Sequence, residues 1–287
     1  MSAEPRTCVG RFSTDLGGSF TLVGGDQQFD YVTIEESAKS AGQSVASLWE
    51  SRLGAVRGQR MPRGRDRIII REETLGPAAK GVWYYGNALV PDEVTLAALL
   101  DAGSTTVWLK MFAFEGKEPL LKEIVLDVAN AYRPDHAAAG PDSFCLALGR
   151  VLLPYRTMER VSRRLEDRAR GLVLLIDMES TLEPERAALS ERLRNVQSAA
   201  AGAGAQIDKL RGGARRVAGM QGEEIVLRLR DKKQRSSLSF GWLFPGEADS
   251  GLKPKVLVRM SGPDRDLADA TRTWDEILNT FRRHGEK

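Results

Sequence analysis

Residues suited to acid–base chemistry are few in this chain of 287 residues, which has only two histidines, His136 and His284. Histidine is the usual general base at neutral pH, so a Ser-His-Asp or Cys-His hydrolase would need one of these two. His136 lies in an unpatterned stretch and His284 lies close to the C-terminus, so neither is at a strand end or on a patterned helix. The sequence motifs of nucleophile elbows, phosphate-binding loops, zinc proteases and zinc deaminases are absent as well. The sequence therefore predicts no catalytic residues and no enzyme.

Three pairs of adjacent glutamates could supply paired carboxylates, namely Glu35-Glu36, Glu72-Glu73 and Glu223-Glu224. Neighbouring residues in a strand point to opposite faces of the sheet, so these pairs do not converge as a glycosidase pair must. We interpret them as solubilising charges at strand ends. The glycine pairs Gly17-Gly18 and Gly24-Gly25 lack the spacing of a phosphate loop and indicate hairpin turns, so no cofactor is expected.

The only two cysteines are Cys8 and Cys145. They have no CxxC spacing and no neighbouring histidine, so no metal site is expected. Each begins an equivalent strand in one half of the chain, and an oxidising compartment would favour a disulfide between them. Two buried thiols, which behave as small apolar side chains, are the open alternative.

One loop is strongly basic, from Arg57 to Arg67, and contains no aromatic residue that could stack on bases. It is either a solvated loop or a surface for an acidic patch on a protein partner. The whole chain has 42 Lys and Arg against 39 Asp and Glu, a net charge of only +3, and outside this loop the two signs are mostly interleaved, which disfavours nucleic-acid binding. No apolar run is long enough for a membrane span, and no signal peptide is recognised.

Hydrophobic spacing predicts the elements that must position these residues. In the first half, strands are expected at Cys8–Phe12, Ser19–Val23, Phe29–Ile34, Arg67–Arg71, Gly81–Tyr85 and Thr105–Phe114, with helices after the N-cap Ser44 and over Leu120–Tyr132. In the second half, strands are expected at Phe144–Leu148, Glu159–Leu165, Leu172–Met178, Glu223–Leu229, Ser237–Phe244 and Lys255–Met260, with helices around Leu189–Val196 and Leu267–Phe281. The strand aromatics Trp83-Tyr84-Tyr85 and Phe240/Trp242/Phe244 are interpreted as core.

The two halves repeat one order of strands and helices, which indicates an internal duplication joined at Pro134–Pro141. The predicted domains are residues 1–134 and 135–287. The predicted fold class is α+β, with two tandem domains of similar topology, each an antiparallel sheet with two helices packed on one face.

Several motifs suggest a family. The segments Ala218-Gly-Met-Gln-Gly-Glu-Glu224 and Phe240-Gly-Trp-Leu-Phe-Pro-Gly-Glu247, with Asp249-Ser250, resemble the C-terminal domain of type VI secretion lipase immunity proteins. The group most resembled is cognate to group-four Tle phospholipases. The final helix Trp274–Phe281 and the Cys8–Phe12 and Phe144–Leu146 segments are also similar to this family, whereas the charged Arg156–Arg170 segment departs from it.

This resemblance implies a binding protein without catalytic residues, which inhibits a cognate secreted phospholipase and belongs in the periplasm. As partner-binding residues we expect Arg63 and Arg65 in the first domain and Glu247 and Asp249 in the second. Two other functions stay open: a periplasmic carrier of lipid or another small ligand, and a nucleic-acid binder using the basic loop.

Overall fold

The computed structural model describes residues 7–135, 140–184, 189, 205–233 and 235–285. The chain divides into two compact units. Unit 1 comprises Met1–Asp26, Ala139–Pro141 and Thr157–Lys287, and unit 2 comprises Gln27–Ala138 and Asp142–Arg156. The fold class is α+β with large antiparallel sheets, as predicted, and the described residues contain three α-helices. None of the described helices is long and apolar enough to cross a membrane.

The main sheet of unit 2 has the strand order β4-β5-β9-β8-β7-β6, and its neighbouring strands are antiparallel. Its strands are β4 (Gln27–Phe29), β5 (Val32–Ala38), β6 (Ile69–Gly76), β7 (Ala79–Tyr85), β8 (Glu93–Ala102) and β9 (Thr105–Phe114). Strands β8 and β9 form a hairpin paired along its whole length, and most of β8 is buried. This hairpin is the centre of the core of unit 2.

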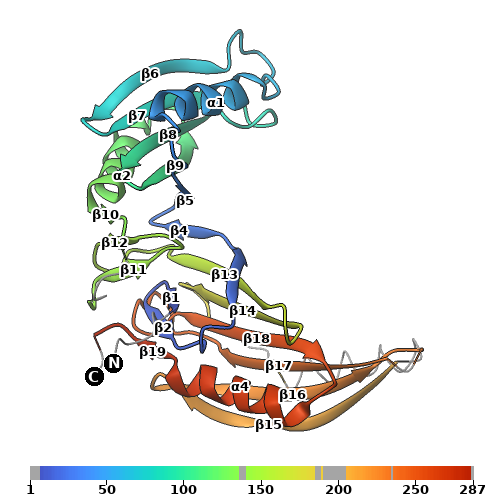
Figure 1. Cartoon of the computed structure of the whole chain (residues 1–287). Coiled ribbons are helices and arrows are strands. Elements are labelled where there is room, and N and C mark those ends of the chain that lie inside the picture. Colours follow the sequence, from blue (N-terminus) through green and yellow to red (C-terminus); the bar gives the residue numbers. More distant parts are fainter. Residues whose placement is uncertain (1–6, 136–139, 185–188, 190–204, 234, 286–287) are drawn as a thin grey trace. The chain divides into compact units, whose positions relative to one another are not determined.

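Two helices cover this sheet (Figure 1). Helix α1 (Val45–Arg57) begins after Ser44, whose hydroxyl accepts a hydrogen bond from the backbone N–H of Ser47, so the predicted N-cap is confirmed. Helix α2 (Glu118–Ala131) has a proline in its first turn. The α1 side of the core contains Trp49, Leu53, Val56, Ile68, Val82, Tyr84, Ala97, Leu99 and Trp108.

The two helices of unit 2 lie on opposite faces, so the prediction that both pack on one face is wrong. Val82 and Tyr84 belong to the α1 core, whereas the indole of Trp83 between them bonds to Glu73, which also accepts from Lys122 of α2. Successive side chains of a strand point to opposite faces. The central strands are apolar on both faces, and each face therefore needs its own cover.

Unit 2 also holds a small sheet with the order β10-β12-β11. Strand β10 (Tyr132–Arg133) follows α2 directly, and the hairpin of β11 (Ser143–Cys145) and β12 (Arg150–Leu152) pairs with it. Phe144 packs edge-on against Phe29 of β4, with ring centroids 5.3 Å apart, which fixes the hairpin on the unit.

The main sheet of unit 1 has the order β15-β16-β17-β18-β14-β13, again antiparallel, with β3 paired to β13. Its strands are β3 (Thr21–Gly24), β13 (Arg160–Asp167), β14 (Leu172–Glu179), β15 (Gln206–Val217), β16 (Met220–Arg230), β17 (Ser236–Phe244) and β18 (Lys255–Pro263). Helix α4 (Leu267–Thr280) packs Trp274 against Phe240, with ring centroids 5.6 Å apart (Figure 1). The aromatic side of β17 is buried, as its period of two predicts.

A small sheet of unit 1 has the order β1-β2-β19 and contains β1 (Thr7–Val9), β2 (Phe12–Thr14) and β19 (Arg282–Arg283). Phe12 stacks on Phe281 at 5.1 Å between ring centroids. Gly10, in the β1–β2 turn, has φ +55°, and a Cβ there would lie 2.6 Å from the sulfur of Met178. Beside it, Arg11 and Glu159 form a bidentate ion pair in which both side chains are buried.

Most expected elements are present, with several differences. Cys8–Phe12 and Phe29–Ile34, each expected as one strand, contain turns and belong to the antiparallel hairpins β1–β2 and β4–β5. The short strands β10, β12 and β19 were not predicted. Neither β8 nor β15 was predicted, because β8 is rich in alanine and leucine and β15 contains a glycine pair among charges, so neither resembles an alternating strand. The helix expected around Leu189–Val196 and most of the join around His136 lie outside the described residues.

Candidate partner-binding surfaces

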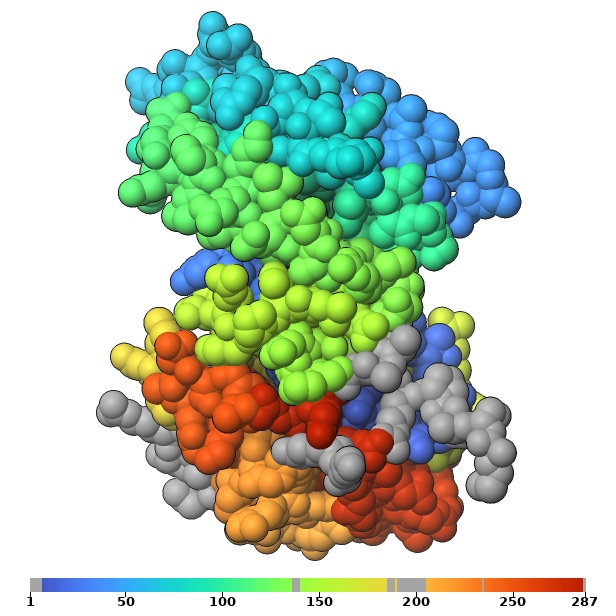
Figure 2. Space-filling view, turned by 90° about the vertical axis from the view of Figure 1, so that its left-hand side faces the viewer, coloured from blue at the N-terminus to red at the C-terminus, as the bar shows by residue number. Residues whose placement is uncertain are grey.

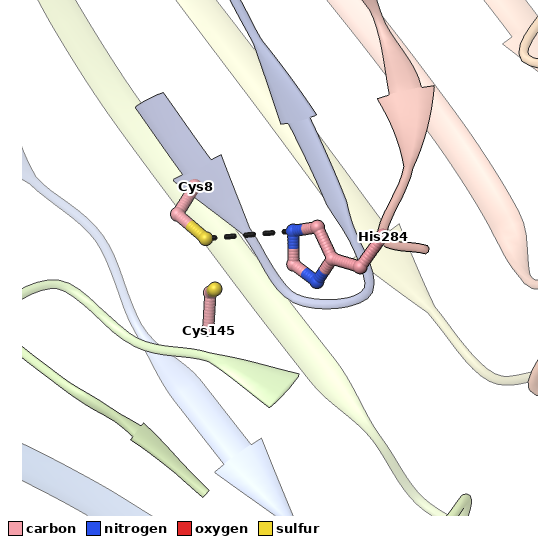
Figure 3. Close-up of side chains that lie close together, drawn as sticks. All are labelled: Cys8, Cys145 and His284. Carbon is pink, nitrogen blue, oxygen red and sulfur yellow. Dashed lines mark hydrogen bonds between the residues drawn. The ribbon is translucent and has the colours of Figure 1, made fainter. Parts of the chain in front are cut away.

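His284 occupies a structural position within unit 1. It is buried, its backbone N–H donates to the carbonyl of Arg11, and its Nε2 lies 3.5 Å from the sulfur of Cys8 (Figure 3). The other histidine, His136, lies outside the described residues.

The cysteines belong to different units, Cys8 to unit 1 and Cys145 to unit 2, where Cys145 is fully buried. Neither is a free thiol in the structure.

The interpretation of the paired glutamates as solubilising charges is wrong for one member of each pair. Glu36, Glu73 and Glu224 accept hydrogen bonds from the Tyr132 hydroxyl and from the indoles of Trp83 and Trp274, at 2.7, 2.6 and 2.6 Å respectively. Alternation along the strand turns one carboxylate of each pair towards the interior. There it fixes an aromatic side chain that would otherwise have an unpaired donor.

Glu224 is the centre of the densest charged network of unit 1 among the described residues. Its Oε1 accepts from Arg211 at 2.8 Å and from Arg215 at 2.7 Å, and both arginines also bind Asp275 of α4. Burial alone would raise the pKa of Asp275, but the hydrogen bonds from Arg211 and Arg215 outweigh it and lower that pKa below 3.8. The network attaches α4 to the edge of the sheet, so its charges are used internally.

Arg65 is held by its own unit. Its Nε donates to the carbonyl of Pro91 at 2.8 Å, its guanidinium pairs with Glu115 at 2.8 Å, and it lies over the ring of Tyr85, 4.1 Å from the centroid. The hydrogen bond from Arg65 to the carboxylate, joined by one from Tyr85, lowers the pKa of Glu115. This arrangement orders the loop between α1 and β6.

Arg63 lies in the same loop and is exposed. Within the described part of the chain, Arg63 has no ion-pair partner, and neither do the exposed Arg60 and Arg67. The loop therefore presents three uncompensated guanidinium groups, whereas Arg65 is committed to the scaffold.

Glu247 and Asp249 lie in the loop between β17 and β18 of unit 1, and both are exposed. Glu247 pairs with Lys253 of the same loop at 2.7 Å. Asp249 adopts a positive φ of 47°, its backbone N–H donates to the carbonyl of Thr181, and its carboxylate accepts from Thr157 at 3.3 Å. The loop is thus fixed at both positions.

Two aromatic side chains that the sequence placed in a strand are largely exposed. Phe112 and Phe114 of β9 have exposed fractions of 60% and 61%. Sequence reasoning missed them because alternation shows which residues share a face and not whether that face is covered.

A cavity of about 550 Å³ in unit 1 lies between the N-terminal segment and α4. Charged groups of Asp15, Arg170 and Glu276 line it, together with several hydroxyl groups. A lipid carrier needs a predominantly apolar pocket, so this cavity does not favour the carrier function.

Comparison with known proteins gives a family and a fold. Residues 142–285 match the family model described as the C-terminal domain of Tle cognate immunity protein 4. None of the curated proteins matches the sequence.

Three solved structures share the fold. The apo structure of the immunity protein TplEi of the T6SS from Pseudomonas aeruginosa has a TM-score of 0.81 at 18% identity and covers 98% of this chain and 97% of its own. The Tle4-Tli4 complex has a chain with a TM-score of 0.80 at 19% identity, covering 98% of both chains. TplEi complexed with "L" peptide has a TM-score of 0.75 at 17% identity, with 98% of both chains covered.

These identities establish similarity of fold alone, while the family model spans half of the chain. The chain therefore belongs to the Tle cognate immunity protein 4 family, and it is an immunity protein that acts by binding and not by catalysis.

Proposed function

We propose that this protein binds a cognate type VI secreted phospholipase and holds it inactive, which protects the producing cell and its sisters. The observation that carries the proposal is the family match over residues 142–285, combined with the fold shared along 98% of the chain with a protein solved as part of the Tle4-Tli4 complex. A phospholipase of this kind acts on membrane lipid from the periplasmic side, so we place the protein in the periplasm.

Inhibition by binding needs only a difference in affinity between two states of the toxin. An interfacial lipase must expose apolar surface to reach a membrane, and a partner that binds its closed state alone shifts the population towards that state. Protection against repeated turnover calls for nanomolar affinity, which corresponds to about −12 kcal/mol.

Titrating this protein into its cognate effector while phospholipid hydrolysis is measured tests the proposal. We expect activity to fall linearly to near zero at equimolar protein, because binding is tight compared with the concentrations used. An unrelated lipase is the control and should keep its activity. Full effector activity at a molar excess would reject the proposal, and co-purifying lipid would then favour the carrier function.

Of the charged residues proposed as partner-binding, Arg63 in unit 2 and Glu247 and Asp249 in unit 1 supply the rim contacts. Arg65 contributes by positioning the loop that carries Arg63. Rim charges mainly set the association rate and the choice of partner. Arg63→Glu should therefore slow association at low salt more than it speeds dissociation, measured by stopped-flow mixing with the effector.

The order of elements also supports the finer topology, two tandem halves of similar fold with boundaries at 1–134 and 135–287. In each unit a main sheet of six strands is followed by a helix, α2 or α4, and then by a short strand that pairs with a hairpin. That hairpin comes from the other half of the chain in both cases: β1–β2 in unit 1 and β11–β12 in unit 2. A duplication in which the opening hairpins were exchanged explains this order.

We propose a disulfide between Cys8 and Cys145, supported by the absence of a free thiol at either position. In the chain-entropy model a bond closing so long a loop stabilises by roughly 5 kcal/mol. Thiol titration of the unfolded, unreduced protein should find no free groups; two free thiols would show that the bond is absent.

A further inference from the structure

An apolar surface on unit 2 has no cover within that unit. Phe112 and Phe114 lie two residues apart on β9, so they share one face, and each exposes about three fifths of its side chain, 60% and 61%. Removing large apolar side chains from water favours association. Two phenylalanines exposed side by side on one strand can therefore stabilise a complex with a partner that covers them.

The geometry of the sheet explains why this surface is open. Trp108 lies on the same face of β9 and is covered by α1, against which its ring lies 6.2 Å from that of Trp49. The pairing of β5 with β9 ends at Lys110, so residues 111–114 are paired with β8 alone. Among the described residues of unit 2, no helix covers the face of β9 beyond α1, and no second strand pairs with β9 beyond Lys110.

Charge next to the surface indicates what it accepts. Glu115, the residue after Phe114, pairs with Arg65, which brings the α1–β6 loop to this end of the sheet. That loop presents Arg60, Arg63 and Arg67 as exposed cations, to which no ion pair within the described residues is assigned. An apolar pair beside uncompensated arginines fits a segment with apolar side chains flanked by carboxylates.

We propose that Phe112 and Phe114 form the apolar centre of the effector contact of unit 2, with the α1–β6 loop as its cationic rim. This inference rests on the proposed function and names the surface that performs it. Arg63 contacts the acidic side chains of the effector, and Arg65 is a positioning residue that holds the loop through Pro91, Glu115 and Tyr85. The space-filling view shows the cyan and green segments of unit 2, which include β6–β9, at the surface (Figure 2).

A bilayer fits this surface less well than a protein does. The two phenylalanines lie on a strand of the sheet and not at a loop tip, and the pairing of β9 with β8 continues to Phe114, so the strand that carries them is held in the sheet.

The test compares the double variant F112S/F114S with the matched control L120S. Leu120 is also exposed, at 51%, and lies on α2 of the same unit, which covers the opposite face. Binding of each variant to catalytically inactive effector is measured by calorimetry, and thermal unfolding checks the fold. We expect F112S/F114S to bind about 30-fold more weakly or worse, the size of an interface hot spot, and L120S to bind as the unmodified protein does.

The outcomes separate this inference from the function on which it rests. If the unmodified protein binds the effector and F112S/F114S binds equally well, the surface is wrong and the function stands. If the unmodified protein does not bind, the proposed function fails and the inference with it. A loss confined to self-association, or to partition onto anionic phosphatidylglycerol vesicles, would also overturn the inference.

Hydrogen exchange of the unmodified complex gives a second measurement, which does not depend on how a variant folds. Residues 111–115 should gain protection when the effector is bound, while α2 should not. Equal exchange at residues 111–115 with and without effector would overturn the inference.

Discussion

Single carboxylates decide the internal electrostatics of this protein. Glu36, Glu73 and Glu224 each belong to a pair of adjacent glutamates, and each bonds to an aromatic donor in its own unit. Their neighbours on the other face have a different environment: Glu35 pairs with Arg52 at an exposed position. Identical side chains one residue apart therefore differ in function because the strand turns them to opposite faces.

Replacing Glu224 tests this interpretation. Glu224→Ala leaves the buried indole N–H of Trp274 without its acceptor and removes a partner of Arg211 and Arg215. We expect a loss of about 2–4 kcal/mol in the free energy of unfolding, measured with urea. Glu72→Ala is the matched control, because Glu72 is exposed and its nearest ion-pair partner is 3.8 Å away; it should change stability by less than about 0.5 kcal/mol. Equal effects of the two variants would contradict the assigned role of Glu224.

The same network predicts how stability depends on pH. The pKa of Asp275 is lowered in the folded state, because hydrogen bonds from Arg211 and Arg215 outweigh the effect of burial. A carboxylate whose folded pKa lies below its unfolded value stabilises the fold above the unfolded value. Its contribution is therefore full at pH values well above 3.8 and is lost as pH falls from there through the lowered pKa.

Urea unfolding between pH 6 and pH 2 measures this, with D275N as the comparison. D275N should have a smaller free energy of unfolding than the unmodified protein at pH 6. This difference between the two proteins should narrow as the pH falls, over the range of about pH 5 to 2 in which an aspartate with a lowered pKa loses its contribution. If the difference in the free energy of unfolding stayed constant over this range, Asp275 would not be the source of the pH dependence.

At the scale of elements, local signals fix the helix starts. Ser44 caps α1 through the backbone N–H of Ser47 at 3.1 Å, and Asp266 caps α4 through that of Asp269 at 2.9 Å. Capping residues satisfy donors that the helix itself cannot. Such signals are contained in a few adjacent residues, so they can be read without the tertiary structure.

Ser44→Ala should destabilise unit 2 by about 1 kcal/mol, because the first turn of α1 loses its side-chain acceptor. Thermal unfolding measures the change, and Ser40→Ala, at an exposed position just before the helix, is the control. A drop of equal size for both variants would assign the effect to the segment and not to the cap.

At the scale of the whole molecule, each unit is built from segments that are not contiguous in the sequence. The N-terminal residues Met1–Asp26 belong to unit 1, with the C-terminal part of the chain, and Asp142–Arg156 belong to unit 2. Phe12 of β2 stacks on Phe281 and is 1% exposed, so the first hairpin is part of the core that α4 closes.

Phe12→Ala therefore tests the composition of the units. We expect a cost of about 3–5 kcal/mol from the cavity and the lost burial. Hydrogen exchange should show lost protection in β13–β18 and α4, with protection kept in β7–β9. Lost protection in β7–β9 instead would show that the first hairpin stabilises the first half of the chain, as strictly contiguous domains would require.

The sequence by itself determined what depends on neighbours along the chain. The N-cap Ser44, the alternation of Phe240, Trp242 and Phe244, the motifs of the C-terminal domain and the absence of a catalytic set all follow from local spacing and residue type. The candidate contact residues stay predictions: the structure shows Arg63 exposed and Arg65 bound by its own unit, but a contact with a partner depends on that partner's surface as well.

Only the tertiary structure decided which faces are covered. Strand β8 was missed because its alanines and leucines resemble a helix until the sheet buries them on both faces. Glu224 is buried because α4 packs over this part of the sheet. Phe112 is exposed because α1 does not cover that end of β9 and because the pairing of β5 with β9 ends at Lys110. The place of the first hairpin in unit 1 is likewise set by pairings between distant segments, such as β2 with β19. Burial and strand pairing depend on segments remote in sequence, and no local pattern carries that information.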